Sequence, residues 1–350
     1  MTATAKTRFE WIDNARVIAA FLVMYIHLSG RASTLGNPEV ASYVSYFSHC
    51  FFMDAAVPFF LILAGYFLAR NITWAKAGKR FISLFIPLVL WNLIVAAAWG
   101  KLPTGPVSFL TDILGINTLV VKQIVLFPHA ESIPIDVPSW FLREIAFLTL
   151  LTPLFVRLHR ILPLILVIYP SFLFFNHTPN AYYVFAPSTV FFYLLGVSLR
   201  KFPVEAAYTI LQPRFTWIMI AALGFALCFL TLNFMTIEPP RPMTTSIFGI
   251  VVGALCLANC GLLIERHLPR FSKYLSQCGP ACFLVFMLHY PIFISLKKLL
   301  PTEVWNTEWT LLVPFPTFVI IVAFYFAMKK WLPWLMPYLA NTRMPKKPAN

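Results

Sequence analysis

The stretch NARVIAAFLVMYIHLSG, residues 14–30, carries Arg16 at one end of an apolar run and His27 near the other. Ionisable side chains are costly inside a membrane, so they commonly mark functional sites there. In a helix, eleven residues make three turns plus about 20°, so both side chains face one direction, about 16 Å apart along the axis. Asp13, three residues before Arg16, is placed to orient its guanidinium. A guanidinium suits phosphate binding, and an imidazole suits proton transfer near neutral pH.

Each of these residues also has an ordinary structural explanation. Arg16 alone is compatible with a snorkelling anchor at the cytoplasmic boundary. A single membrane histidine is compatible with a packing residue whose nitrogens are satisfied. The pair with its preceding acid is more informative than either residue alone.

The composition is that of a polytopic α-helical membrane protein. Hydrophobic residues make up 59% of the 350 residues and charged residues 11%, with a mean hydropathy of +0.77. Apolar runs long enough to cross a bilayer recur along the chain, and the alternating pattern of a β-barrel does not. We expect a bundle of about ten transmembrane helices, near 16–30, 43–69, 81–99, 139–156, 161–176, 182–199, 215–235, 244–264, 280–296 and 310–328.

The positive charge indicates topology rather than nucleic-acid binding. The net charge is +14, but no basic tract is interleaved with aromatic residues. With a cytoplasmic N-terminus and ten spans, 20 of the 27 Lys and Arg residues lie in cytoplasmic segments, as the positive-inside rule requires. Both termini are therefore expected in the cytoplasm. We expect one transmembrane domain over 1–335 and a disordered cytoplasmic tail over 336–350.

WIDNARVIAAFLVMYIH resembles the first helix of acyltransferase family 3 membrane proteins. The family motif is an Asp, an Arg three residues later and a His eleven after that, and Asp13, Arg16 and His27 match it. Four further segments resemble family helices in order: VPFFLILAGYFLAR (57–70), KRFISLFIPLVLWN (79–92), SWFLREIAFLTLLTP (139–153) and CFLVFMLHYP (282–291). The first of these resembles the second-helix signature of the family, except that Ala64 stands where a Ser is usual.

The resemblance implies transfer of an acyl group, commonly acetyl, from cytoplasmic acyl-CoA to a hydroxyl of an extracytoplasmic glycan. The branch that looks closest contains surface-polysaccharide O-acetyltransferases of the bacterial inner membrane without an attached soluble hydrolase-like domain. Acyl-CoA is then a substrate, and no tightly bound cofactor is expected. The identity of the acceptor, the length of the acyl group and the oligomeric state stay open.

Such a reaction needs an anchor for the CoA phosphates and a base for the acceptor hydroxyl. Arg16, Lys79 and Arg80 are the candidate anchors, although Lys79 and Arg80 are equally compatible with topology anchors. His27 is the candidate base, or a nucleophile that forms an acyl-imidazole. Glu144 is the candidate partner carboxylate for the imidazole, unless it pairs with Arg143 or faces the outer interface.

Three more residues are candidates for the acceptor cavity. Asp54 lines that cavity or pairs with an arginine, and His289 contributes to the site or packs at a helix end. Trp140 stacks on a sugar ring or is an interfacial aromatic. The scattered histidines indicate no metal site. The competing function is a transporter or flippase for a glycan or small metabolite, although we detect no half-repeats. A third possibility, a structural or assembly partner in envelope biogenesis, leaves the alignment of Asp13, Arg16 and His27 on one helix face unexplained.

Overall fold

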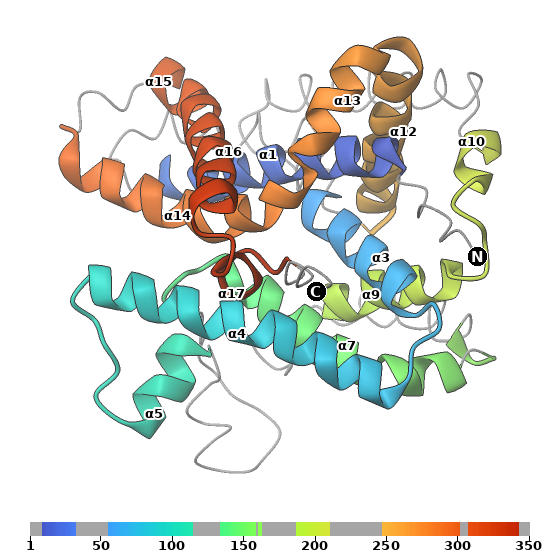
Figure 1. Ribbon diagram of the computed structural model, residues 1–350, viewed down its shortest axis with the longest axis horizontal. Coiled ribbons are helices and arrows are strands. Elements are labelled where there is room, and N and C mark those ends of the chain that lie inside the picture. Colours follow the sequence, from blue (N-terminus) through green and yellow to red (C-terminus); the bar gives the residue numbers. More distant parts are fainter. Residues whose placement is uncertain are drawn as a thin grey trace, which may run out of the picture. The chain divides into compact units, whose positions relative to one another are not determined.

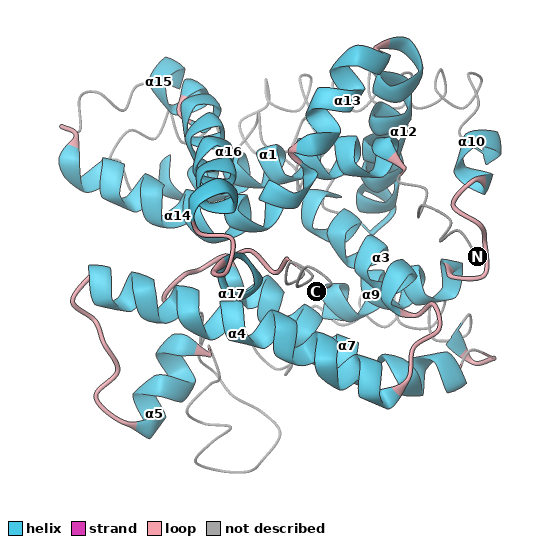
Figure 2. Ribbon diagram, viewed as in Figure 1, coloured by secondary structure: helices cyan, strands magenta, loops and turns pink. Residues whose placement is uncertain are grey.

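The computed structural model describes residues 9–32, 55–114, 134–158, 160–162, 187–210, 247–301 and 307–342. Every regular element within these ranges is a helix, which confirms the expected all-helical class (Figure 2). The chain forms two bodies. The first comprises Met1–Ala56 and Val204–Cys282, and the second comprises Val57–Pro203 and Phe283–Asn350.

The apolar helices confirm a multi-pass membrane protein. Eight of the ten expected spans overlap a described helix, although the first part of the second span, 43–54, lies outside the described residues, as do 215–235 and nearly all of 161–176. Two described apolar helices are shorter, Ala56–Leu68 and Thr189–Leu199. Six are long and apolar enough to cross a bilayer: Glu10–Leu28, Trp74–Ala98, Ser139–Arg157, Ile250–His267, Pro269–Leu299 and Trp309–Trp331. The total of ten spans and the placement of the termini stay predictions.

The first body is built around α1 (Glu10–Ala32). This helix packs against α12 (Ile247–His267) and α13 (Pro269–Gln277) (Figure 1). The backbones of α1 and α12 approach so closely that a Cβ atom at Gly261 would collide with the carbonyl of Trp11. A short helix, α10 (Ala206–Ile210), is hydrogen-bonded to α12, because the Tyr208 hydroxyl donates to Glu265 Oε2 at 2.9 Å.

Polar side chains fasten α13 to the start of α1. The Ser272 hydroxyl donates to Glu10 Oε2 at 2.9 Å, and Asn14 Nδ2 donates to Ser272 Oγ at 2.8 Å. Ser272 and Asn14 are fully buried. A buried hydrogen-bonded chain of this kind holds α13 in one register, because breaking any link leaves polar groups unsatisfied.

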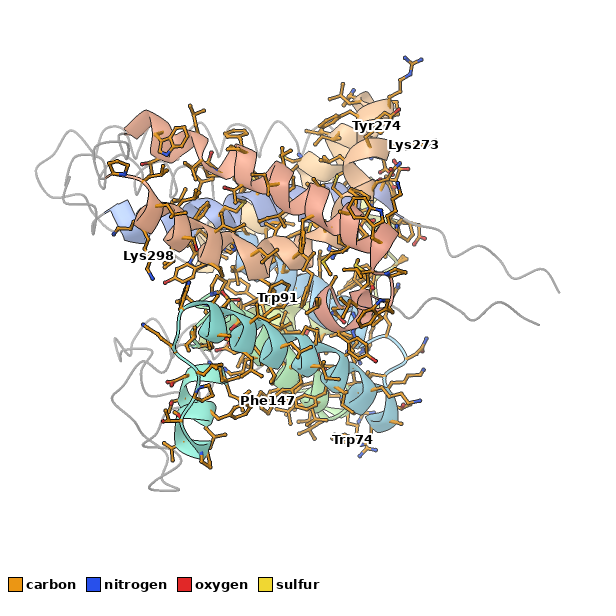
Figure 3. The ribbon with its side chains drawn as sticks, turned by 60° about the vertical axis from the view of Figure 1, so that its left-hand side comes forward. Trp74, Trp91, Phe147, Lys273, Tyr274 and Lys298 are labelled. Carbon is orange, nitrogen blue, oxygen red and sulfur yellow. The ribbon has the colours of Figure 1, made fainter. Side chains whose placement is uncertain are left out.

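The second body contains the pair α4 (Trp74–Ala98) and α7 (Ser139–Arg157), which lie side by side (Figure 1). Phe81 of α4 packs on Phe147 of α7, with 5.5 Å between ring centroids. Figure 3 labels Phe147. Around them the body holds α3 (Ala56–Leu68), α9 (Pro187–Leu199), α14 (Cys282–Leu299) and α16 (Pro314–Trp331). The shorter elements are α5 (Pro106–Ser108), the π-helical turn η3 (Phe109–Ile113) and α15 (Thr307–Leu312).

Two glycines bring α3 and α9 into backbone contact. A Cβ atom at Gly65 would collide with the Tyr193 carbonyl, and one at Gly196 would collide with the Ile62 carbonyl. Small residues commonly allow membrane helices to approach in this way. The glycine of the second-helix signature therefore has a packing role in this chain.

The segment after α16 forms the short helix α17 (Met336–Leu339), which packs against α4. The Trp91 indole donates to the Leu339 carbonyl at 2.8 Å, and Met336 is buried. Ordered structure therefore continues past residue 335, where we expected the transmembrane domain to end. The residues after 342 lie outside the described part of the chain.

Candidate functional site

Asp13, Arg16 and His27 lie on a single unbroken helix, α1. Arg16 Nη1 donates to Asp13 Oδ1 at 3.0 Å, so the predicted pairing of these two residues is present. The Arg16 side chain is about one-third exposed, at 34%, and can still take a further anionic partner. His27 is half-buried. The helical spacing places it about 16 Å along the axis from Arg16.

The carboxylate of Asp13 rests against the backbone of Gly279, at the start of the 3-10 turn η6 (Gly279–Ala281). A Cβ atom at residue 279 would lie 2.7 Å from Asp13 Oδ1, the atom that accepts from Arg16. Only a residue without a side chain leaves this space free. Gly279 therefore supports the geometry of the ion pair, although nothing in the spacing of the sequence connects it with Asp13.

The other basic candidates lie on the first two turns of α4, in the second body. Lys79 and Arg80 are both exposed there. They follow the N-cap of the helix, where the Thr73 hydroxyl accepts the N–H of Lys76 at 3.3 Å. Because they are exposed, Lys79 and Arg80 can contact an anion in solution or in a lipid headgroup. Asp54, a candidate for the acceptor cavity, lies outside the described residues.

Glu144 is buried in α7 and pairs with its neighbour Arg143, which is one of the alternatives that the sequence left open. Arg143 Nη2 lies 3.7 Å from Glu144 Oε1, and Arg143 Nη1 donates to the Leu114 carbonyl at 3.3 Å. Glu144 is only 3% exposed. A buried carboxylate with a cationic neighbour is compatible with a structural ion pair and with a charged group that orients an imidazole.

His289 is fully buried in α14, where its Nδ1 lies 2.6 Å from the Val285 carbonyl. One turn earlier, Phe286 stacks on Phe141 with 5.3 Å between ring centroids. This stack joins α14 and α7 one turn from His289 and one turn from Glu144. The second body thus brings the helices of these two candidates together. Trp140 is half-buried beside the stack and packs edge-on against Phe141.

A family model described as an acyltransferase domain matches residues 9–328, nearly the whole chain. The chain belongs to acyltransferase family 3. No curated protein and no solved structure matches it. The acyltransferase match includes all five segments in which the sequence resembles the family, from the first helix to the His-Pro helix.

No three His, Cys, Asp or Glu side chains described here lie close enough together to hold an ion. Within the described ranges Asp13 and Arg16 form an ion pair in the first body, and in the second body Glu144 and His289 lie on helices that meet at the Phe141–Phe286 stack.

A polar cluster before α7 was not recognised in the sequence. The Asn92 side chain accepts the N–H of Asp136 at 2.9 Å and donates to Ser139 Oγ at 2.8 Å. Asp136 is fully buried, and neither of its carboxyl oxygens has a hydrogen-bond partner within the described residues. Burial raises the pKa of Asp136 well above its ordinary value. Its partner Asn92 is 44 residues away, so sequence spacing gave no signal.

We expect Asp136 to make the stability of the acyltransferase fall as pH rises. A carboxyl whose pKa is raised in the folded state binds its proton more tightly there than in the unfolded chain. Its contribution is complete below the unfolded pKa of about 3.9 and is lost as pH rises through the folded pKa. Asp136→Asn stays neutral, so its thermal midpoint should match wild type at pH 4 and exceed it at pH 8. Exposed Glu205→Gln is the control, and a difference that is equal at both pH values would contradict this assignment.

Proposed function

We propose that this protein transfers an acyl group, acetyl in the simplest case, from cytoplasmic acyl-CoA to a hydroxyl of an extracytoplasmic glycan. The observation that carries the proposal is α1, which holds an Asp13–Arg16 ion pair at one end and His27 three turns further along. Family membership supports acyl transfer over the transporter alternative. A bacterial inner membrane and a surface-polysaccharide acceptor belong to the proposal.

In this proposal Arg16 binds a phosphate of the donor. A guanidinium makes two parallel hydrogen bonds to a phosphate, and Asp13 holds it in position by accepting one of its other N–H groups. Lys79 and Arg80 supply further positive charge to the donor. The pantetheine arm then reaches along α1 toward His27, over a distance of about 16 Å.

His27 acts as the base in the direct form of the reaction. It accepts the proton of the acceptor hydroxyl while the oxygen attacks the thioester carbonyl and the carbon–sulfur bond breaks. The products are the acylated hydroxyl and the thiol of CoA, which takes up the proton. In the two-step form, the His27 imidazole attacks the thioester carbonyl, the carbon–sulfur bond breaks, and the CoA thiol leaves with the imidazole proton. The acceptor hydroxyl then takes the acyl group from the acyl-imidazole, and its proton returns to the imidazole. Glu144 is the proposed partner carboxylate, and Asp54, Trp140 and His289 are proposed for the acceptor cavity.

Inverted inner-membrane vesicles that contain the protein test the proposal, because their outer surface is the cytoplasmic face. Radiolabelled acetyl-CoA added outside should label a glycan fraction inside the vesicles, and right-side-out vesicles should stay unlabelled because the donor does not cross the bilayer. Vesicles from the same host without the protein are the control. Absence of labelling with a range of acyl donors and acceptors, despite inserted protein, would overturn acyl transfer and favour the transporter.

A further inference from the structure

Helix α13 carries its polar face toward the protein and its aromatic face outward. Ser272 and Ser276 are buried, and Ser272 bonds with residues of α1. On the opposite side, Phe271 is 52% exposed and Tyr274 is 71% exposed. This arrangement is the reverse of that in a helix on the surface of a soluble protein, whose apolar face turns inward.

Two basic residues flank the aromatic face. Arg270 and Lys273 are exposed, and α13 has no acidic residue. At 100° per residue, Arg270 and Lys273 lie on one side of Tyr274, and Phe271 lies on the other. Figure 3 shows Lys273 and Tyr274 next to each other on this helix. Exposed aromatic rings beside basic side chains, without acids, are typical of helices that lie in the headgroup region of a bilayer.

The length of the neighbouring span supports the same location. The apolar stretch Pro269–Leu299 has 31 residues, which as continuous helix would cover about 46 Å. A bilayer core is only about 30 Å thick, and α14 alone, with 18 residues, covers about 27 Å of it. The charged and polar α13 is therefore the part outside the hydrocarbon. It ends at Gln277, and η6 (Gly279–Ala281) separates it in the chain from α14.

We infer that α13 is an interfacial helix that binds anionic lipid headgroups. Phe271 and Tyr274 enter the boundary between headgroups and acyl chains, while Arg270 and Lys273 contact lipid phosphates. On the predicted orientation this is the cytoplasmic leaflet. Because Ser272 bonds with Glu10 and Asn14, the lipid surface also sets the depth of the first turns of α1. The inference does not depend on the acyl-transfer proposal.

Spin labels on α13 measure its depth in the membrane directly. A keto amino acid, p-acetylphenylalanine, introduced separately at 271 and 274 and coupled to a nitroxide, leaves the six native cysteines in place. Both positions are exposed, so the labels should not disturb packing. In vesicles with 30% phosphatidylglycerol, collision rates with oxygen and with an aqueous nickel complex should place both labels at headgroup depth. Free access to nickel, or burial at hydrocarbon depth, would overturn the inference.

Charge variants test the anionic part of the inference. Arg270→Gln/Lys273→Gln should move the labels toward water, which is measured as a severalfold increase in nickel accessibility. Purely zwitterionic vesicles should have the same effect on the unchanged protein. Lys329→Gln/Lys330→Gln, an equal charge change among exposed residues at the end of α16, is the matched control and should leave the labels in place. Unchanged depth in the α13 double variant and in zwitterionic vesicles would overturn the role of anionic lipid.

Discussion

Replacing His27 with alanine should lower acyl transfer by about 10³-fold, within the range that a positioned general base contributes. The loss should appear in kcat, because the imidazole acts on the reacting atoms and Arg16 still holds the donor. His27 is half-buried in the C-terminal half of α1, so truncating it should leave the helix and its packing on α12 and α13 intact. The measurement is transfer of radiolabelled acetyl from acetyl-CoA by purified protein in vesicles.

A second histidine provides the control for this prediction. His267 lies exposed at the end of α12 in the same body, and His267→Ala should keep the wild-type rate. Equal amounts of inserted protein and equal thermal midpoints would show that the loss in His27→Ala is chemical. Full activity in purified His27→Ala would remove the central residue from the proposed mechanism.

The same preparation distinguishes direct transfer from a two-step reaction. Without an acceptor, a two-step enzyme keeps the labelled acyl group on the protein, and the label should be released by hydroxylamine. His27→Ala should then retain no label. A direct enzyme stays unlabelled until the acceptor is added, and both results leave the acyl-donor role of CoA intact.

The transmembrane helices were largely predictable because long apolar runs indicate them directly. The span expected at 139–156 is helix Ser139–Arg157, and that expected at 280–296 is helix Cys282–Leu299. The helix expected at 81–99 begins earlier, at Trp74, because Thr73 caps it and its first turns are polar. Hydropathy does not detect a helical start of that kind.

Other elements were missed because their signal is not apolar periodicity or because it joins distant residues. Helix α13 is short and polar, and its amphipathicity is the reverse of the usual pattern. Asp136 meets Asn92 across 44 residues, and Gly279 meets Asp13 across most of the chain. Such contacts depend on how the helices pack, which a single sequence does not encode in any local spacing.

The contact between Gly279 and Asp13 leads to the second large effect. Gly279→Ala should raise the KM for acyl-CoA about tenfold, which corresponds to about 1.4 kcal/mol, with little change in kcat. The new methyl group would lie 2.7 Å from Asp13 Oδ1 and 3.0 Å from Asp13 Cβ, so the short side chain has to rotate away. Arg16 then loses the 3.0 Å hydrogen bond that positions it for a phosphate.

Two comparisons separate this effect from a general loss of packing. Gly78→Ala on α4 places a methyl group where no atom lies within 4 Å, so it should leave both constants unchanged. Arg16→Ala should raise the KM by itself, and Gly279→Ala should add almost nothing to it, because residues that act through one contact are not additive. If the two changes multiplied instead, Gly279 would affect the donor by a route other than the Asp13–Arg16 pair, and the anchoring role of that pair would have to be abandoned.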